Sequence, residues 1–331
     1  MKHNFFLTLT FVLLAIFVLI GIKYGFLSPR PPVKEDVGIN IVKTMAVSRS
    51  SVERQNQENV QVVSSSNYLN DPVGDDLAIE TSKELRLLTF NIRHGVNEKG
   101  EESLDSIIQS IKETKAEIIA LQEVDRFMPR SGFKDQAKEI AKALGYNYVY
   151  GETINLLGIK YGNAILSAYP IVEHENHKLY SKEIETRGLL KVVINIDGLL
   201  YHVYTTHLGL NSEERIKQIE QINDIVESDS GERIILMGDF NEESHTSTMQ
   251  QISNMLIDST EWIDGDIEFY TYAFYSDKPN TRIDRIYVGQ NIEILDHYVI
   301  ETETSDHCMV VAVISHNKPI KEGIMTFTEN E

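Results

Sequence analysis

The sequence predicts an α/β domain in which helices cover layers of β-sheet. From residue 85 onward, short apolar runs of strand length alternate with amphipathic helical patterns. The dipeptide Asp197-Gly198 lies between two apolar runs and predicts a tight hairpin, which brings an antiparallel pair into the sheet. Because other strands are separated by helices, we expect sheets of mixed strand direction.

The expected strands follow the apolar runs in chain order. They comprise residues 85–92, 117–124, 189–196, 199–208, 233–237, 282–288, 292–300 and 308–314. A first helix is expected where Leu104, Ile107, Ile108 and Ile111 recur at helical spacing. Further helices are expected at residues 134–144 and 213–226, with a weaker pattern at 248–257. Gly145 follows the second helix as a C-cap.

Residues 5–22 form an apolar run without a charged side chain. As a helix this run would be about 27 Å long, close to the thickness of the hydrocarbon core of a bilayer. The flank that starts at Lys23 lacks the small residues of a signal-peptidase site. We therefore expect an uncleaved transmembrane anchor, preceded by a tail of residues 1–4, rather than a cleaved signal peptide.

The remaining segments are expected to form a tether, one domain and a tail. Residues 23–84 are polar, with few aromatic side chains and no sustained period, which is typical of a flexible tether. The domain covers residues 85–316, and residues 317–331 form a loose C-terminal tail. Lys2 and the amino terminus precede the apolar run, whereas Lys23, Arg30 and Lys34 follow it, so charge alone mildly favours a cytoplasmic C-terminal side. Since short N-terminal tails more often stay inside, we expect a single-pass cell-membrane protein with an extracytoplasmic domain.

Composition excludes several classes of function. The formal charge is −19, from 50 acidic and 31 basic residues, so the chain lacks the basic surplus of a tight nucleic-acid binder. Cys308 is the single cysteine, which excludes an intramolecular disulfide and zinc sites built on cysteine pairs. We expect Cys308 to be a core residue of its strand rather than a nucleophile.

Polar side chains recur at the ends of the expected strands. They are Asn91, Gln122, Glu123, Thr206, His207, Asp239, Asn241, Asp306 and His307. Taken alone, each is more often a cap, a turn residue or a hydrogen-bonded core histidine. Because the pattern repeats at several strands, we expect these side chains to meet along one sheet edge. Carboxylates and amides suit a hard cation such as Mg²⁺, and the imidazoles suit phosphate contacts or proton transfer.

Six motifs carry a resemblance to a known superfamily. They are Thr89-Phe90-Asn91-Ile92-Arg93-His94-Gly95, Leu121-Gln122-Glu123-Val124-Asp125, Thr206-His207-Leu208-Gly209, Gly238-Asp239-Phe240-Asn241, Arg282-Ile283-Asp284 and Ser305-Asp306-His307. In their order and approximate spacing, the chain resembles the endonuclease/exonuclease/phosphatase superfamily of DNase I-like, metal-dependent phosphoesterases over residues 85–315. The resemblance implies a four-layer α/β sandwich, in which two mixed sheets face each other and helices lie outside.

The resemblance also implies a metal side of the site. Glu123 is similar to the main Mg²⁺ ligand of the family, and Asn91 assists it. Asp306 is similar to the second carboxylate on the metal side. Mn²⁺ is the expected substitute for Mg²⁺.

A base side and a phosphate side are implied in the same way. Asp239 resembles the residue that orients and deprotonates the attacking water, which Asn241 holds together with a phosphate oxygen. His307 resembles the histidine at the scissile phosphate, and Asp284 the acid that fixes its tautomer. His207 resembles a further histidine that contacts phosphate or protonates the leaving oxygen.

Arg187 is a further candidate phosphate contact, with a surface salt bridge as the equally weighted alternative. Two positions depart from the family pattern. Arg285 follows Asp284 where relatives often carry an aromatic residue, and residues 242–245 lack the proline that many relatives have after the Asp-Phe-Asn motif. The first departure affects a local contact and the second affects the rim of the site. Each of the implied catalytic positions is present, which argues against a degenerate enzyme.

The resulting expectation is a membrane-anchored, Mg²⁺-dependent phosphoesterase with a monomeric catalytic domain. The anchor and the acidic balance favour a phosphodiesterase that acts on a small molecule or a lipid headgroup. A metal-dependent endonuclease or exonuclease for DNA or RNA is the alternative. A non-catalytic module that binds a phosphorylated ligand is a third hypothesis, disfavoured because Glu123, Asp239 and His307 are all present.

Overall fold

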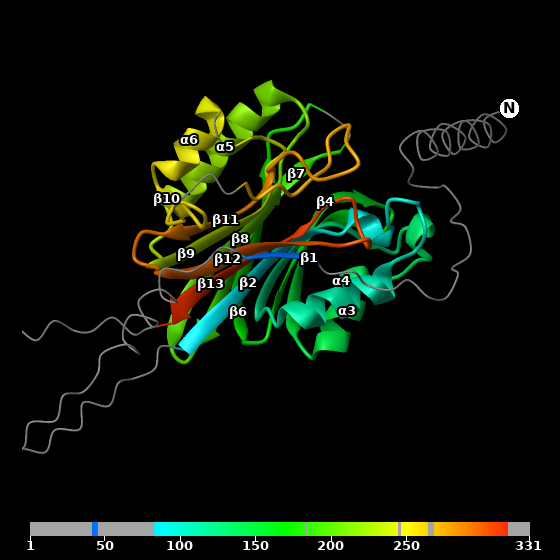
Figure 1. The fold of residues 1–331 in the computed structure, drawn as a ribbon, viewed down its shortest axis with the longest axis horizontal. Coiled ribbons are helices and arrows are strands. Elements are labelled where there is room, and N and C mark those ends of the chain that lie inside the picture. Colours follow the sequence, from blue (N-terminus) through cyan, green and yellow to red (C-terminus); the bar gives the residue numbers. More distant parts are fainter. Residues whose placement is uncertain (1–41, 46–82, 183–184, 244–245, 264–267, 317–331) are drawn as a thin grey trace, which may run out of the picture.

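Two mixed β-sheets pack face to face in the protein (Figure 1). This computed structural model describes residues 42–45, 83–182, 185–243, 246–263 and 268–316. In spatial order, the first sheet contains β1 (Val42–Met45), β12 (Ile294–Glu301), β13 (Met309–His316), β2 (Lys83–Asn91), β3 (Ile118–Arg126), β5 (Ile159–Ser167) and β4 (Asn147–Leu156). The second contains β10 (Leu256–Asp258), β11 (Asp284–Gly289), β9 (Arg233–Asp239), β8 (Leu199–His207), β7 (Arg187–Ile196) and β6 (Ile171–Leu179).

Each sheet has one parallel pair of strands at its centre. β2 runs parallel to β3 in the first sheet, and β8 runs parallel to β9 in the second, whereas the other described pairs are antiparallel. The carboxyl ends of these four strands lie at the same edge of the sandwich, because Asn91 at the end of β2 donates to Asp239 at the end of β9, and Gln122 of β3 donates to Thr205 of β8. We call this edge the site edge.

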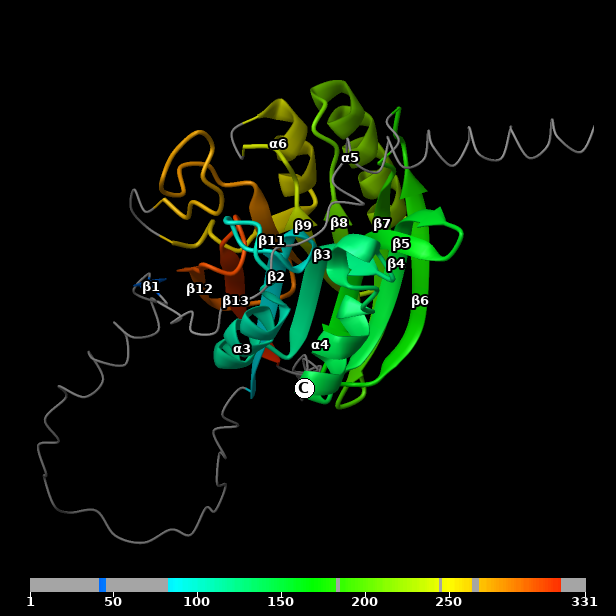
Figure 2. The ribbon, with the colours of Figure 1, turned by 90° about the vertical axis from the view of Figure 1, so that its right-hand side faces the viewer.

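Helices cover the outer faces of both sheets. They are α3 (Leu104–Thr114), α4 (Gln136–Leu144), α5 (Ser212–Glu227) and α6 (Ser247–Ser253), with short 3₁₀ turns at Arg93–Gly95 and Pro129–Ser131. One buried cluster lies between the sheets, a second joins the first sheet to α3 and α4, and a third joins the second sheet to α5 and α6. Figures 1 and 2 show the two pairs of helices on opposite sides. The expected four-layer α/β sandwich is therefore the observed architecture.

Local sequence signals account for several boundaries. The side chain of Asp135 caps α4 by accepting from the backbone N–H of Lys138, and Gly145 ends this helix with φ +73°. Asn211 caps α5 in the same way, accepting from the N–H groups of two following residues. Asp197 and Gly198 both have positive φ, 52° and 87°, as a tight type I′ hairpin requires.

Some elements differ from the sequence expectation. The strands β4, β5 and β6 were not predicted, and the expected helix at 248–257 ends at Ser253, with Leu256–Asp258 forming β10 instead. β6 reads Ile-Val-Glu-His-Glu-Asn-His-Lys-Leu and is mostly exposed, because it is the outermost strand of its sheet. An edge strand of this kind has a weak apolar pattern and is formed by pairing with its neighbour β7.

The expectations for the two ends of the chain fall almost entirely outside the described residues. The expected anchor at 5–22 and the tail at 317–331 lie there, so the structure does not test them. Within the described part of the chain, no helix is long and apolar enough to cross a membrane. Val42–Met45, inside the expected tether, forms β1 and pairs antiparallel with β12.

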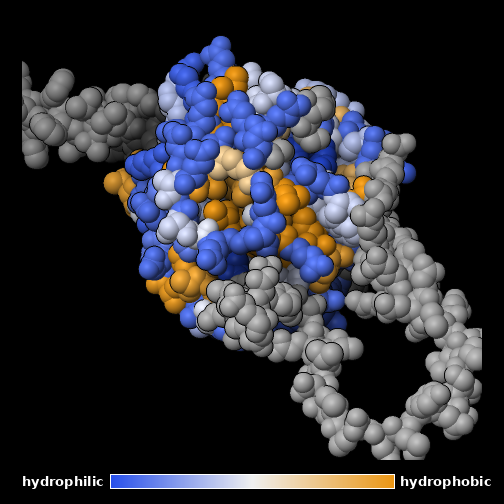
Figure 3. Space-filling view, turned by 90° about the vertical axis from the view of Figure 1, so that its left-hand side faces the viewer, coloured by the Kyte–Doolittle hydropathy of each residue, from blue (hydrophilic) through white to orange (hydrophobic). Residues whose placement is uncertain are grey.

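The surface and the single cysteine agree with the composition. Hydrophilic residues (blue) predominate on the face drawn in Figure 3, with hydrophobic residues (orange) gathered near its middle.

Cys308 is 4% exposed, and burial raises the pKa of its thiol. A buried thiol with a raised pKa is a poor nucleophile, in line with the expected core role.

A buried histidine makes stability depend on pH. His297 is fully buried, its Nδ1 lies 2.8 Å from Ser259 Oγ, and burial together with the charge of Arg282 lowers the pKa of His297 from 6.5 to about 3. The unfolded chain therefore binds one more proton than the folded chain as pH falls from 6.5 towards 3. The free energy of unfolding decreases on this descent, by up to about 1.4 kcal/mol per pH unit.

We expect His297→Gln to reduce this pH dependence, because the variant lacks the titrating group. Urea titrations of both proteins between neutral pH and about pH 5 measure the effect. The difference in free energy of unfolding between wild type and variant should narrow as the solution becomes more acidic. A difference that stays constant with pH would contradict this account of His297.

Candidate active site

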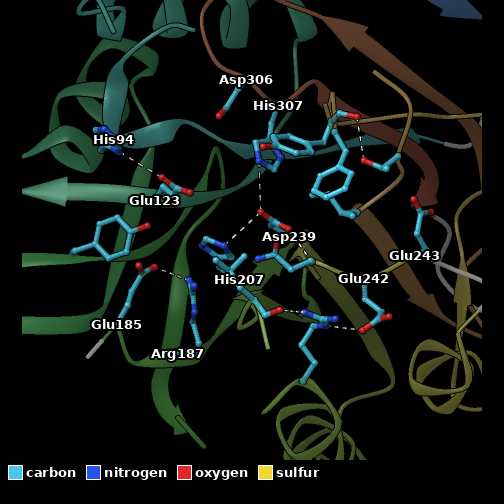
Figure 4. Close-up of a pocket in the computed structure, with 18 of the residues that line it drawn as sticks. His94, Glu123, Glu185, Arg187, His207, Asp239, Glu242, Glu243, Asp306 and His307 are labelled. Carbon is cyan, nitrogen blue, oxygen red and sulfur yellow. Dashed lines mark hydrogen bonds and ion pairs between the residues drawn. The ribbon is translucent and has the colours of Figure 1, made fainter. Parts of the chain in front are cut away.

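A cleft of about 820 Å³ opens at the site edge (Figure 4). Among the residues that line it, the titratable ones and the amide are His94, Glu123, Arg130, Tyr161, Glu185, Arg187, His207, Arg215, Asp239, Asn241, Glu242, Glu243, Tyr272, Asp306 and His307. Most of the strand-end residues expected from the sequence are among them. Asn91 and Asp284 lie directly behind the lining, hydrogen-bonded to Asp239 and His307 respectively.

Glu123 projects into the cleft from an irregular position in β3. The register with β5 shifts between Leu121 and Val124, and Glu123 has φ +56°. A positive φ is unfavourable for glutamate and is maintained only where surrounding structure holds it, as at many functional sites. Its carboxylate is 23% exposed and has two long contacts, 3.2 Å to Asn91 Nδ2 and 3.4 Å to His94 Nδ1.

Asn91 connects Glu123 to Asp239. Its Nδ2 donates to Glu123 Oε1 at 3.2 Å and to Asp239 Oδ2 at 3.0 Å. Its Oδ1 accepts from the backbone N–H of Arg93 at 3.0 Å. One amide thus holds the carboxylates of two different sheets at a defined separation.

Asp239 is the centre of the cluster. It is 1% exposed at the end of β9, where it is in register with His207 on β8 and with Asp284 on β11. Its Oδ1 accepts from the backbone N–H of Asn241 at 2.9 Å, and its Oδ2 lies 3.5 Å from His207 Nε2 and 3.8 Å from His307 Nε2. Asn241 is held by donation from its Nδ2 to the carbonyl oxygen of Leu208 at 2.9 Å.

Burial makes Asp239 a much weaker acid than an ordinary aspartate. Burial and the nearby charge of Asp284 raise the pKa of Asp239 to about 7, against the opposing effects of His307, Asn91 and the N–H of Asn241. A carboxylate whose pKa lies near neutrality is suited to accept a proton from a reacting group.

The two cleft histidines have opposite protonation tendencies. Burial opposes charge on His307, but the carboxylates of Asp284 and Asp239 raise its pKa to about 10, and Asp284 Oδ2 lies 2.9 Å from His307 Nδ1. Burial and the charge of Arg187 hold the pKa of His207 well below 6.5. At neutral pH, His307 is therefore a cation and His207 a neutral imidazole, which gives them different roles in handling charge and protons.

The residues present fit a hard cation on the metal side. Although burial alone would raise it, the pKa of Glu123 is held below its usual range by the hydrogen bond with His94 and by the charge of His307, so Glu123 is ionised. Asp306 also lines the cleft, with its Oδ2 3.3 Å from Arg93 Nε. Two carboxylates are oxygen donors of the kind that Mg²⁺ or Mn²⁺ prefers. The Asn91 amide beside them turns its nitrogen towards Glu123 and its oxygen towards the N–H of Arg93.

A second group also has the composition of a metal site. One ligand atom each of Asp239, Asp284 and His307 lies within 4.8 Å of the others. These atoms already pair with one another, because the His307 imidazole lies between the two carboxylates. The positive charge of His307 would repel a second cation at this position, whereas the carboxylates of Glu123 and Asp306 have no such charge between them.

Arg187 is a buried wall residue rather than a surface residue. It is 5% exposed, lines the cleft, and its guanidinium lies 2.8 Å from Glu185. The sequence left open whether it contacts phosphate or forms a surface salt bridge. It forms an ion pair inside the cleft, from which it can reach a bound anion only in competition with Glu185.

The sequence reading did not assign roles to His94 and Gln136. His94 contacts Glu123 directly, and Gln136 is 1% exposed at the start of α4. Gln136 Nε2 donates to the carbonyl oxygen of His94 at 2.8 Å, and its Oε1 accepts from the backbone N–H of Asp125 at 2.8 Å. One side chain therefore holds the two backbone segments that flank Glu123, and only the folded arrangement brings it there.

We expect Gln136→Met to lower activity by about 10- to 100-fold and to raise the Mg²⁺ concentration needed for half-maximal rate, as is typical when support for a metal ligand is removed. Methionine keeps the volume but makes neither hydrogen bond. Initial rates across a Mg²⁺ titration measure the effect, with exposed Gln109→Met on α3 as the matched control. An unchanged Mg²⁺ dependence in a folded Gln136→Met protein would contradict a positioning role.

Fold and site together define a phosphoesterase sandwich of the DNase I-like class. The profile of the Endonuclease/Exonuclease/phosphatase family matches residues 88–307, more than half of the chain. The chain belongs to this family, as its six motifs indicate. Members of the family are metal-dependent hydrolases that act on phosphoesters.

Relatives and solved structures agree with this assignment. The uncharacterized protein YbhP of Escherichia coli strain K12 is 29% identical over 227 residues, a match that covers 61% of this chain and 84% of YbhP. An endonuclease/exonuclease/phosphatase from Beutenbergia cavernae matches 70% of this chain and 71% of its own at 21% identity, with a TM-score of 0.61. The mannosyl-6-phosphatase Bt3783 of Bacteroides thetaiotaomicron matches 70% and 99% at 19% identity, with a TM-score of 0.56. At these identities the structures show the shared fold alone.

Proposed function

We propose that the protein is a membrane-anchored, Mg²⁺-dependent phosphodiesterase for a small or lipid-headgroup phosphoester. The observation that carries this proposal is the position of Asp239, which contacts the metal side through Asn91 and lies within 4 Å of two imidazoles of opposite protonation tendency. A base, a cation site and a positive imidazole around one cleft are the groups that attack by water on phosphorus requires.

The metal side would hold the cation. Glu123 and Asp306 would bind it through carboxylate oxygens, with Asn91 beside them. When bound, Mg²⁺ supplies positive charge that stabilises the negative charge developing on the phosphoryl oxygens. Mn²⁺ fits the same oxygen donors.

Side chains of the cleft would carry out the proton transfers. Asp239 would take the proton of the attacking water, and the amide of Asn241 would orient that water and a phosphate oxygen. His307, held in one tautomer by Asp284, would donate to the phosphate as a cation. His207, a neutral imidazole on the opposite side of Asp239, would contact the phosphate or relay a proton to the leaving oxygen.

The charges of the cleft support a small substrate rather than a nucleic-acid backbone. Each arginine that lines it has a carboxylate partner, Arg130 with Asp125, Arg187 with Glu185 and Arg215 with Glu242. Paired arginines contribute little net positive field, and Glu243 adds negative charge at the rim. A polynucleotide requires several unpaired cations along its path.

The location is proposed from the sequence. The apolar run at 5–22 would anchor the chain in the cell membrane, with the tether at 23–84 leading to an extracytoplasmic, monomeric catalytic domain. An anchored enzyme has membrane-borne substrates at high local concentration. This placement supports a lipid headgroup over a freely diffusing compound.

A parallel assay distinguishes the substrate classes. The purified full chain is incubated with Mg²⁺ and, separately, with phospholipid vesicles, sphingolipid vesicles, plasmid DNA and RNA. We expect release of a headgroup from vesicles without nicking of the plasmid. Rapid DNA or RNA cleavage at physiological salt would overturn the preference in favour of a nuclease, and turnover of no phosphoester would support a non-catalytic binding module.

A further inference from the structure

Large exposed apolar side chains concentrate at the site edge. They are Phe127, Phe133, Leu156, Leu157, Leu210, Ile216, Phe274 and Tyr275, which together we call the apolar rim. They come from the segment after β3, the tip between β4 and β5, the start of α5 and the loop between β10 and β11. Leu210 and Phe274 also line the cleft. Among the described residues, the other large exposed apolar side chains are Val172 and Leu200, which lie towards the opposite edge.

The exposure of the rim residues is extreme for their type. Leu157 is 98% exposed, Tyr275 95%, Leu210 69% and Phe133 64%. Single exposed apolar side chains are common, but several around one opening are typical of a binding surface. Placement on loop tips, where the side chains pack little against the domain, is suited to insertion into a soft apolar phase.

The chain enters the domain at the same edge. Val42, the first residue of β1, pairs with Glu301, the last residue of β12. The segment after Glu301 leads directly to Asp306 and His307. The tether from the expected anchor at 5–22 therefore reaches the domain beside the cleft, and the 19 residues between the apolar run and β1 span at most about 70 Å.

Charge indicates which kind of membrane the rim fits. The chain has a formal charge of −19, and the cleft arginines are paired with carboxylates. An anionic surface would repel this field, whereas a zwitterionic surface leaves apolar burial as the driving force. Phe and Tyr at the rim are residue types that reside at a lipid–water boundary.

We propose that the apolar rim docks on the surface of a zwitterionic lipid bilayer, so that the cleft opens onto the phosphoester layer of the membrane that holds the anchor. This inference rests on the proposed function, which it deepens by naming a lipid phosphoester at the interface as the substrate class. Docking brings the scissile phosphate to Asp239 and His307 without extracting the lipid. The tether entering beside the cleft favours the same orientation.

The first experiment measures contact with the bilayer independently of catalysis. Because Cys308 is buried, a single surface cysteine can be labelled selectively with an environment-sensitive fluorophore. The full chain carrying Ser276→Cys, beside Tyr275, is compared in phosphatidylcholine vesicles with Ser230→Cys, an exposed position between α5 and β9 at the opposite edge. We expect the label at 276, but not at 230, to shift to the blue and to be quenched by spin-labelled lipid. Equal emission from both labels, without quenching, would overturn the docking proposal.

The second experiment separates docking from chemistry. The variant Phe133→Ser/Leu157→Ser/Tyr275→Ser alters rim residues that do not line the cleft. We expect it to lose about tenfold or more in hydrolysis of vesicle lipid, since withdrawing each such side chain from the bilayer costs on the order of a factor of ten in binding. Hydrolysis of a soluble phosphodiester should stay unchanged, as should both activities in the control Leu200→Ser.

The outcomes distinguish the two proposals. Equal loss on vesicle lipid and soluble diester, or no loss on either, would count against docking while leaving the phosphodiesterase intact. Quenching of the label at 276 without hydrolysis of any phosphoester would support docking and refute the proposed activity.

Discussion

Replacing Asp239 by asparagine should lower the rate of phosphodiester hydrolysis by about 10²- to 10⁴-fold, the range over which positioned general bases contribute. Asparagine keeps the shape of the side chain and can still accept from the backbone N–H of Asn241, but it cannot take up a proton. The change should appear in kcat, measured with a chromogenic diester at saturating Mg²⁺.

The fold of this variant supplies the control. Since burial raises the pKa of Asp239 to about 7, above its ordinary value of 3.8, its charged form opposes folding at neutral pH and above. Asp239→Asn should therefore unfold in urea at no lower a concentration than the metal-free wild type. Exposed Asp105→Asn on α3 should leave activity unchanged. A well-folded Asp239→Asn protein with wild-type kcat would exclude Asp239 as the base.

Replacing Glu123 by glutamine should cost about a hundredfold or more in kcat/KM, because a bound cation contributes several kcal/mol to such reactions. The amide retains hydrogen-bonding capacity towards Asn91 and His94 but lacks the charge that binds the cation. The apparent Mg²⁺ affinity should fall in parallel, measured by calorimetric titration of the protein without substrate.

The matched control for this change is Glu98→Gln, at an exposed position after the first motif. It removes the same charge from the protein without touching the cleft lining. Wild-type Mg²⁺ affinity in Glu123→Gln would place the cation elsewhere, and the group of Asp239, Asp284 and His307 would then be the next candidate.

Much of the fold was predictable because its central strands are strongly apolar. β2, β3, β9 and β13 are buried along nearly their whole length, so each appears as a continuous apolar run. β4 and β6 lie at or near the outer side of their sheets and carry polar residues, and their pairing is decided by neighbours far away in sequence. The periodicity of one segment carries no information about those neighbours.

The members of the site were predictable, but their physical state was not. Motifs placed Glu123, Asp239 and His307 in one cleft, and the structure brings them together. The bulge that turns Glu123 into the cleft, and the amide of Asn91 that joins both sheets, depend on three-dimensional pairing. The same holds for Gln136, which is far from Glu123 in sequence yet holds its flanking segments.

Arg285 illustrates a departure that the structure partly explains. It is fully buried beside Asp284, donates to the carbonyl oxygen of Arg282 at 2.6 Å, and its Nε lies 3.8 Å from Asp258. The buried guanidinium is thus accommodated by one hydrogen bond to the backbone of Arg282 and a long ion pair with Asp258. Asp284 itself retains its contact with His307.

The most direct test of the account is hydrolysis of bis(p-nitrophenyl) phosphate by the purified full chain, with Mg²⁺, after removal of metal by EDTA, and in the Asp239→Asn variant. We expect turnover with Mg²⁺, its loss in EDTA, its recovery when Mg²⁺ is restored in excess, and little activity in the variant under any of these conditions. Turnover that persists in EDTA and is unaffected by Asp239→Asn would contradict a metal-dependent phosphoesterase centre built on Glu123 and Asp239.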